Sequence, residues 1–267
     1  MPELPEVETI RRQLEPSLTH KTIQEIRVFW EKTLSGASQA SLSPVLQGQV
    51  IRRVRRRGKY FVLELDRGFL VYHLRMSGRL YVSPDAMGED RWVRLSLTFS
   101  DQTHLIFSDT RKFGRVYYDD SLHDLETKLG PEPLKLPVEQ WHELFARSKT
   151  KIKAFLLNQS KLAGIGNIYS DESLFQAEIH PARPADSLTE EESLRLAKAV
   201  QERLSTAIQH EGATISWYRK PDGSQGESQK HFKVYGKYGR PCPVCGKELC
   251  RTLVSQRTTT FCSHCQK

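Results

Sequence analysis

Four cysteines near the C-terminus constrain the fold of this chain more strongly than any other feature. Cys242 and Cys245 form one C-x2-C pair, and sixteen residues later Cys262 and Cys265 form a second. This spacing is typical of two knuckles whose thiolates complete a tetrahedron around one zinc ion. Four thiolates leave no open coordination position, so we expect a structural Zn²⁺ that supplies folding energy to a short segment. Disulfide pairing is the alternative.

Positive charge is concentrated in two segments of the chain. The 267 residues include 40 Lys and Arg against 32 Asp and Glu, a formal net charge of +8. Six of the eight residues from 52 to 59 are cationic, and residues 230–267 hold eight Lys or Arg against the single acid Glu248. Such zones suit contacts with nucleic-acid phosphates, although a solvated face is the alternative for the first of them.

The N-terminal residues, the apolar runs and the cysteines indicate in which cellular compartment the protein works. No run of 18 apolar residues occurs, so we expect no membrane span. The opening residues MPELPEVET are acidic and do not form a basic stretch followed by an apolar one, so they do not resemble a secretory signal. Clustered cysteines are typical of metal binding in a reducing compartment. We therefore expect a cytoplasmic protein.

The first half of the chain has the pattern of β-strands. Apolar runs flank the turn-prone tripeptide 66–68, and a later run alternates with period two, as a half-buried strand should. Ahead of them, Val7, Ile10 and Leu14 fall on one face of a short helix expected at 6–14. We expect strands at 60–65, 69–74, 95–99 and 104–107.

The pattern becomes helical after residues 130–133, whose sequence Gly-Pro-Glu-Pro breaks regular structure and predicts an interdomain linker. Residues 187–190 read as a capping box that opens a helix with an apolar stripe from Leu194 to Ile208, and Gly212 ends it. The polar residues 216–230 lack periodicity and predict a mobile loop. Two shorter helices are expected at 138–146 and 152–157.

The N-terminus offers a candidate nucleophile. Small residues at position 2 permit removal of Met1, which leaves Pro2 with a free secondary amine. Such an amine can attack a sugar C1′ and form an iminium intermediate. Proline is otherwise unremarkable at this position, and the residue type alone does not decide the matter.

The wider sequence resembles the bacterial formamidopyrimidine-DNA glycosylases, which act on 8-oxoguanine. The resemblance begins with the opening nine residues and covers essentially the whole chain. Any one of the short matching strings could arise by chance, but their common order could not. The matching strings are residues 57–60, 73–78, 109–114, 129–134, 164–169, 234–236 and 256–259.

The resemblance implies an α+β multidomain protein. Its parts would be an N-terminal β-sandwich with flanking helices, a helix-two-turn-helix module and a β-hairpin zinc finger. We expect the catalytic domain at 1–133, the DNA-binding domain with a loop that covers the lesion at 134–230, and the finger at 231–267. The implied partner is damaged double-stranded DNA, bound by a monomer.

The resemblance also implies the chemistry. The chain would excise oxidised purines, 8-oxoguanine and formamidopyrimidines, and cleave the abasic site by β,δ-elimination through a Schiff base on Pro2. Glu3 would act as the adjacent acid and base. Lys59 would reach the site from a hairpin turn, and Arg257 of the finger would contact the phosphate beside the lesion. Without the family match, these side chains would be ordinary surface charges.

Extruding a nucleotide leaves a gap in the duplex, which inserted side chains must fill. The resemblance assigns this to Met76, Arg111 and Phe113, with Arg111 bonding to the orphaned cytosine. One departure from the family concerns residues 90–94, where many relatives carry a histidine, so that Arg91 or Arg94 would substitute. The further DNA contacts that the resemblance implies are His73, Lys149, Lys153, Asn167 and Tyr235.

Two other functions remain open from the sequence. The related endonuclease VIII group prefers oxidised pyrimidines and shares Pro2 and Glu3, but it generally has Gly where Leu4 stands here. A DNA-binding protein without catalysis would also show basic zones and a zinc finger. Borohydride trapping separates an enzyme with an amine nucleophile from a mere binder.

Overall fold

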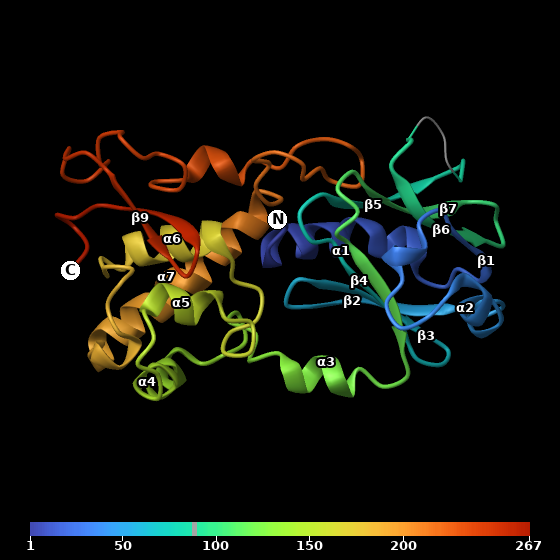
Figure 1. Ribbon diagram of the computed structural model, residues 1–267, viewed down its shortest axis with the longest axis horizontal. Coiled ribbons are helices and arrows are strands. Elements are labelled where there is room, and N and C mark those ends of the chain that lie inside the picture. The colour runs from blue at the N-terminus through green and yellow to red at the C-terminus, as the bar shows by residue number, and fades with distance from the viewer. Residues whose placement is uncertain (87–89) are drawn as a thin grey trace. The chain divides into compact units, whose positions relative to one another are not determined.

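A computed structural model describes residues 1–86 and 90–267 of the chain (Figure 1). The residues form two compact units. The first contains Met1–Glu126 together with His210–Gln229, and the second contains Thr127–Gln209 and Lys230–Lys267. Residues 210–229 thus pack with the first unit, although the sequence places them in the expected domain 134–230.

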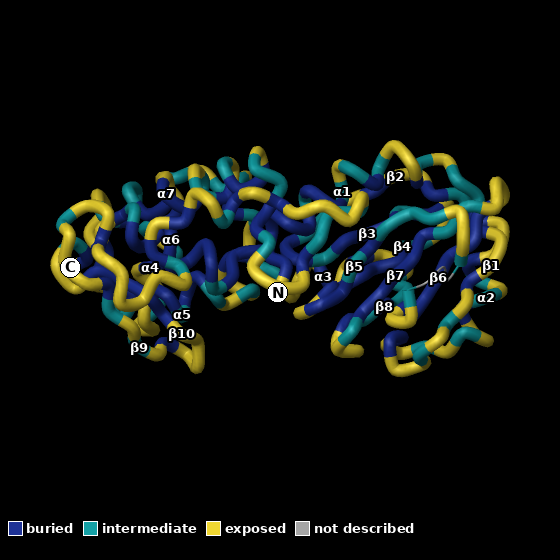
Figure 2. Tube along the Cα trace, turned by 90° about the horizontal axis from the view of Figure 1, so that it is seen from above, coloured by how far each residue is buried: buried dark blue, intermediate teal, exposed yellow. Residues whose placement is uncertain are grey.

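Two four-stranded antiparallel sheets form the sandwich of the first unit. One has the order β2-β3-β4-β8 and the other the order β1-β6-β7-β5. Large apolar side chains such as Phe61, Tyr72, Phe99 and Phe107 fill the core between them, and Figure 2 shows these strands as largely buried. The strands are β1 (Ile23–Val28), β2 (Ile51–Arg57), β3 (Tyr60–Leu65), β4 (Phe69–His73), β5 (Gly78–Ser83), β6 (Val93–Phe99), β7 (His104–Asp109) and β8 (Arg115–Asp119).

All four strands expected from the sequence are present, within two residues at their ends. The turn between β3 and β4 depends on Gly68, which has φ +69° and lies against Tyr118 so closely that no Cβ fits. The period-two pattern at 95–99 belongs to β6, but the expected half-buried strand is buried along its whole length, because its polar Ser96 and Thr98 are covered as well.

Helix α1 (Leu4–Leu18) packs on the sandwich and carries the N-terminus with it. It begins two residues before the expected helix because Pro5 is accommodated in the first turn, where its missing N–H has no partner to lose. Val7, Ile10 and Leu14 are buried, which confirms the expected apolar face. The unit also contains α2 (Gln39–Leu46), and α3 (His123–Lys128) runs from the first unit into the second.

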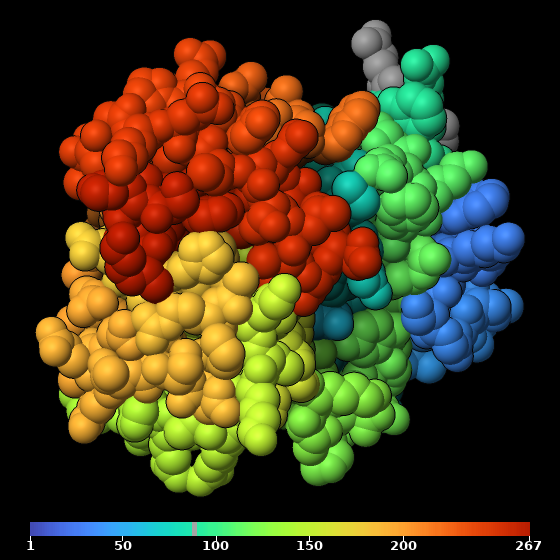
Figure 3. All heavy atoms as spheres, turned by 60° about the vertical axis from the view of Figure 1, so that its left-hand side comes forward, coloured from blue at the N-terminus to red at the C-terminus, as the bar shows by residue number. Residues whose placement is uncertain are grey.

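The second unit is helical, with a hairpin at its end. Helix α7 packs against α4 and α6. Its predicted stripe is buried from Ala197 to Ile208, whereas Leu194, the first residue of that stripe, is only half-buried. Figure 3 shows the red atoms of the C-terminal segment gathered on one face of this unit. The elements are α4 (Trp141–Ala146), α5 (Ile152–Leu157), α6 (Asn167–Gln176), α7 (Glu190–Gln209), β9 (Cys250–Val254) and β10 (Arg257–Phe261).

The capping box of α7 lies two residues later than the sequence prediction placed it. Thr189 Oγ1 accepts from the Glu192 N–H at 3.2 Å, and Glu192 Oε2 accepts from the Thr189 N–H at 2.9 Å. Ser187 belongs to a preceding 3₁₀ turn, Ala185–Ser187. Both pairs satisfy the same Ser/Thr-x-x-Glu pattern, so the pattern alone could not choose between them.

Candidate active site and metal centre

The N-terminal residues lie at the start of α1 and are held there by Glu6. Pro2 is buried, and Glu3 is 2% exposed. Glu6 Oε2 accepts from the Glu3 N–H at 2.8 Å, and its other oxygen, Oε1, accepts from the Ala213 N–H at 2.8 Å. One carboxylate therefore fixes both the catalytic candidates and the beginning of the 213–230 loop. The sequence prediction missed this residue.

Gly212 makes this close approach possible. Its φ is +77°, and a Cβ built on it would lie 2.9 Å from Glu6 Cγ. The loop that follows is anchored by Tyr218, which is buried in the sandwich core and donates its hydroxyl to the Glu211 carbonyl at 3.1 Å. The segment is therefore built onto the first unit at both points.

Lys59 and His73 lie at neighbouring ends of paired strands. Lys59 follows Gly58 in the tight β2–β3 turn and is 5% exposed. Burial and the positive charges of Arg75 and Lys59 lower the pKa of His73 to about 3, so its imidazole is neutral. His73 Nδ1 accepts from the Arg75 N–H at 3.1 Å. The ring proton must then be on Nε2, which makes that atom a hydrogen-bond donor.

The loop after β7 is organised around the carboxylate of Asp109, which is 1% exposed. Asp109 Oδ1 accepts from the Ser77 hydroxyl and, at 3.1 Å, from the Arg111 N–H. Its Oδ2 accepts from the Gly114 N–H at 2.7 Å. This carboxylate ties Ser77, just before β5, to the loop after β7 that carries Arg111 and Phe113. The sequence prediction did not single it out.

The three expected wedge residues come together from two loops: Met76 lies between β4 and β5, and Arg111 and Phe113 follow β7. Met76 is 41% exposed and Phe113 is 46% exposed. Arg111 lies between them: its Nη1 donates to Met76 Sδ at 3.3 Å, and its guanidinium carbon is 4.8 Å from the Phe113 ring centroid. Large apolar side chains left in water beside a cation are suited to insertion between bases.

Residues 90–94, where the chain departs from the family, give two arginines different surroundings. Arg94 is 7% exposed and its Nε donates to the Asp109 carbonyl at 2.8 Å. Arg91 is exposed, with its guanidinium carbon 4.7 Å from the Trp92 ring centroid. Of the two expected substitutes for the family histidine, only Arg91 is therefore accessible to a phosphate.

The cysteine cluster of the second unit has the geometry of a closed metal site. The four Sγ atoms of Cys242, Cys245, Cys262 and Cys265 lie within 4.8 Å of one another. Two of the separations are 3.9 Å and 3.5 Å. Four sulfurs at the usual Zn–S length of about 2.3 Å stand roughly 3.8 Å apart in a tetrahedron. A disulfide bond has an S–S distance of about 2.05 Å, so these Sγ–Sγ separations exclude disulfide pairing.

The hairpin β9–β10 presents Arg257 at its tip. Ser255 and Gln256 have φ of +50° and +59°, as a two-residue turn of this hand requires. Arg257 is exposed immediately after them. Asn167 is the first residue of α6, and its Nδ2 donates to the Thr258 carbonyl at 3.0 Å. The structure thus brings the helix N-terminus and the hairpin tip together.

Lys153 is not available for the phosphate contact expected of it. Its side chain is fully buried, with Nζ 2.6 Å from Asp171 Oδ1 and 2.7 Å from Thr259 Oγ1. The ammonium therefore holds α5 and α6 to β10. The sequence around Lys153 does not show whether its side chain is buried or lies on the surface. Lys149, by contrast, is exposed.

Glu172, beside Asp171 on α6, positions the segment before the finger. It is 1% exposed, and its carboxylate accepts from the backbone N–H groups of Lys233, Val234 and Tyr235 at 2.8 to 3.0 Å. This fixes the backbone of Tyr235, an expected DNA contact. The sequence analysis did not identify Asp171 or Glu172, because α6 also carries Asn, Ser and Gln and the two acids do not stand out in it.

The predicted residues therefore divide between the two units. Seven of them, Pro2, Glu3, Lys59, His73, Met76, Arg111 and Phe113, belong to the first. The second unit holds Lys149, Lys153, Asn167, Tyr235, Arg257 and the four cysteines. No helix among the described residues is both long and apolar enough to cross a bilayer.

Comparison with known proteins gives matches over both units. Residues 1–116 match the formamidopyrimidine-DNA glycosylase N-terminal domain, and residues 129–219 match its H2TH domain. The formamidopyrimidine-DNA glycosylase of an Exiguobacterium strain is 40% identical over 274 residues, with all of both chains covered.

Solved structures give the same result. The crystal structure of a Lactococcus lactis Fpg variant with Fapy-dG-containing DNA has a TM-score of 0.92 and 36% identity, with all of both chains covered. The Lactococcus lactis Fpg complex with DNA containing an abasic site has a TM-score of 0.91 and 36% identity, with 99% of both chains covered. This chain belongs to the formamidopyrimidine-DNA glycosylase family.

Proposed function

We propose that this chain excises 8-oxoguanine and formamidopyrimidines from double-stranded DNA and cleaves the resulting abasic site, with Pro2 as the nucleophile. The observation that carries the proposal is the buried Pro2–Glu3 pair at the start of α1, in a chain of this family. Relatives solved with Fapy-dG-containing and abasic-site DNA support both halves of the activity.

The free amine of Pro2 would form the covalent bond to the sugar. Once Met1 is removed, the Pro2 nitrogen attacks C1′ of the damaged nucleotide, and the base leaves with the electron pair of the N-glycosidic bond. Ring opening gives an iminium ion between Pro2 and C1′. The iminium withdraws electrons, so β- and then δ-elimination remove the two phosphates, and water releases the sugar fragment.

The local structure suits these steps. Pro2 and Glu3 stand at the positive end of the α1 dipole, which disfavours a protonated amine and leaves its lone pair available for attack. Glu3 lies next to the nucleophile in the chain and is the group we assign to proton transfer during base departure and ring opening. Lys59 comes from the β2–β3 turn, and we assign Arg257 to the phosphate during the second elimination.

The contacts with DNA come from both units. We assign insertion into the duplex to Met76, Arg111 and Phe113, which are already assembled around Asp109. His73 can donate Nε2–H to a phosphate without the cost of a buried charge. The remaining phosphate contacts would be Lys149, Asn167 and Tyr235. Lys153 would contribute only by holding the β9–β10 hairpin in place.

The second unit contributes a closed thiolate site. Cys242, Cys245, Cys262 and Cys265 hold one Zn²⁺ that fixes the hairpin bearing Arg257 and takes no part in the chemistry. We propose 1–133, 134–230 and 231–267 as the functional divisions, with 210–229 built onto the first unit. The enzyme would act as a monomer on DNA in the cytoplasm.

Two assays test this function. Duplexes with 8-oxoguanine opposite cytosine should be cleaved much faster than duplexes with thymine glycol, and a reversed preference would instead indicate an endonuclease VIII-type enzyme. Borohydride should trap the protein covalently on 8-oxoguanine DNA. Pro2→Gly and Glu3→Gln should sharply reduce turnover with folding intact, and normal glycosylase rates in both variants would refute the assigned roles.

A further inference from the structure

A small pocket of the second unit lies between the finger and the C-terminal end of α6, with a volume of about 260 Å³. None of the residues that line it is assigned a DNA contact, and only Cys265 belongs to the metal centre. Sites for small molecules usually measure roughly 300–1,000 Å³. This pocket therefore suits a single side chain better than a cofactor.

The floor of the pocket is apolar and is already formed in the free protein. Phe175, which is 7% exposed, belongs to the apolar cluster that packs α6 against the finger, and Cys265 packs on the same cluster. Beside them, Pro243 and Val244 of the first knuckle are exposed, Val244 at 72%. An apolar side chain docked here would remove this surface from water without rearranging the finger.

The rim of the pocket carries two cations whose charged ends have no hydrogen-bond or ion-pair partner among the described residues. Arg203 on α7 donates only its Nε, to Gln176 Oε1, so both of its Nη atoms remain available. Lys233 uses its backbone N–H on Glu172 at 2.8 Å, which fixes its backbone and leaves its ammonium exposed. Two such donors on one rim suit a carboxylate.

The charge around the pocket decides which occupants are favoured. Residues 230–250 hold five Lys or Arg against the single acid Glu248, so an acidic segment is attracted and a basic one is repelled. A second copy of this chain carries the same net charge of +8, which disfavours self-association at a basic face. An acidic segment of another macromolecule is therefore the better match.

The pocket lies at the opposite end of α6 from a residue assigned to DNA. Asn167 begins this helix beside Thr258 of the hairpin, whereas Gln176, which lines the pocket, ends it. Ten residues at 1.5 Å per residue set the two ends about 14 Å apart. The pocket can therefore be occupied while the start of α6 contacts DNA.

Two features favour a protein over a nucleic acid as the occupant. Among the described residues, Phe175 has the only aromatic ring in the pocket wall, and it is too buried to offer a face on which a base could stack. The wall also includes the exposed acid Glu178, which would repel a phosphate. An apolar centre with charges of both signs around it is typical of protein–protein contacts.

We propose that this pocket docks an acidic segment of a partner protein. One apolar side chain of that segment would lie against Phe175 and Val244, and a neighbouring carboxylate would bond to Arg203 and Lys233. A backbone N–H of the same segment would meet Glu178. This inference goes beyond the proposed function, because it gives the chain a way to be recruited by another protein while it is bound to DNA.

The first experiment selects the ligand from a random dodecapeptide library. The bait is the full zinc-loaded chain, with an excess of duplex DNA that contains a stable abasic-site analogue, so that the DNA contacts are occupied. The enriched peptides should combine Leu, Ile or Phe with neighbouring Asp or Glu. Enrichment of peptides rich in Lys and Arg, or no enrichment at all, would overturn the proposal.

The second experiment titrates the most enriched peptide, synthesised with a fluorescent label, by anisotropy. Val244→Ser and Arg203→Gln should each weaken binding by about tenfold, the usual effect of losing one buried apolar contact or one charged hydrogen bond. The matched controls are Leu253→Ser, another exposed apolar residue of the finger, and Arg147→Gln, an exposed arginine of the same unit. All four variants should keep one zinc per chain.

Equal binding of the peptide by the wild type and both pocket variants would overturn the proposal. Displacement of the peptide by the abasic-site duplex would also overturn it, since the pocket would then belong to the nucleic-acid surface. The expected result is that peptide and duplex bind together, with the affinity for the duplex unchanged. An inactive wild type would instead contradict the proposed function, and the peptide titrations would still decide whether the pocket docks a protein.

Discussion

The buried pair Lys153–Asp171 gives the sharpest test of how the finger is held. Both side chains are essentially without solvent contact, and their charged atoms are 2.6 Å apart. Asp171→Asn leaves the Lys153 ammonium buried without its counter-charge, which typically costs about 3–5 kcal/mol of unfolding free energy. The double variant Lys153→Met, Asp171→Leu removes both charges and should recover most of that loss.

Urea unfolding of the zinc-loaded protein at pH 7.5, followed by circular dichroism, measures these differences. Lys149→Met is the matched control, since an exposed lysine should change the free energy by less than about 0.5 kcal/mol. A cost for Asp171→Asn below about 1 kcal/mol would show that the pair does not hold the finger in this way. A double variant no more stable than the single variant would show the same.

The same pair has a pH signature. Burial raises the pKa of the Asp171 carboxyl to about 6, although Lys153 opposes this. The folded state therefore binds this proton more tightly than the unfolded chain, whose carboxyl titrates near 4. The contribution of Asp171 to stability thus falls as the pH rises from about 4 to about 6. Asp171→Asn should remove this part of the pH dependence.

Three other outcomes are expected. Asp109→Asn takes an acceptor from the Ser77, Arg111 and Gly114 donors, so the preference for 8-oxoguanine opposite cytosine over adenine should fall by roughly tenfold; an unchanged ratio would count against the wedge assignment. Because the pKa of His73 is lowered to about 3, His73→Gln should weaken DNA binding equally at pH 5.5 and pH 8 in anisotropy titrations, and a loss confined to pH 5.5 would show that the ring is charged there. Chelation should release one zinc per chain and abolish DNA binding, whereas binding that survives metal release would contradict the role of the finger.

Much of this fold could be predicted from periodicity and spacing. The cysteine spacing predicts the thiolate cluster because C-x2-C leaves little freedom at each knuckle. The strands from 60 to 107 are readable because each is an apolar run that is buried in the structure and bounded by turn residues. The α7 capping box was displaced because Ser187 and Thr189 both satisfy the same rule.

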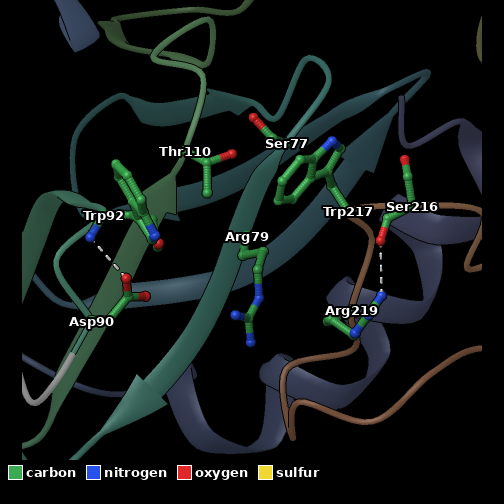
Figure 4. Close-up of a pocket in the computed structure, with 9 residues that line it drawn as sticks. Ser77, Arg79, Asp90, Trp92, Thr110, Ser216, Trp217 and Arg219 are labelled. Carbon is green, nitrogen blue, oxygen red and sulfur yellow. Dashed lines mark hydrogen bonds between the residues drawn. The ribbon is translucent and has the colours of Figure 1, made fainter.

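The residues that organise the site were harder to predict. Glu6, Asp109 and Glu172 act through backbone N–H groups that are distant in the chain, and no local pattern records those partners. Lys153 was misjudged because a lysine in a short helix looks the same in the sequence whether it faces water or Asp171. A pocket of the first unit is lined by Trp92 and, 125 positions later, by Trp217 (Figure 4), so only the fold reveals it.

The proposed chemistry requires the N-terminal amine of Pro2 to form the covalent bond to DNA. The most direct measurement is borohydride reduction on 8-oxoguanine DNA, followed by proteolysis and mass-spectrometric mapping of the modified peptide. We expect the reduced sugar adduct on Pro2 of a chain that has lost Met1. An adduct on Lys59 or another side chain, or no adduct at all, would contradict the account.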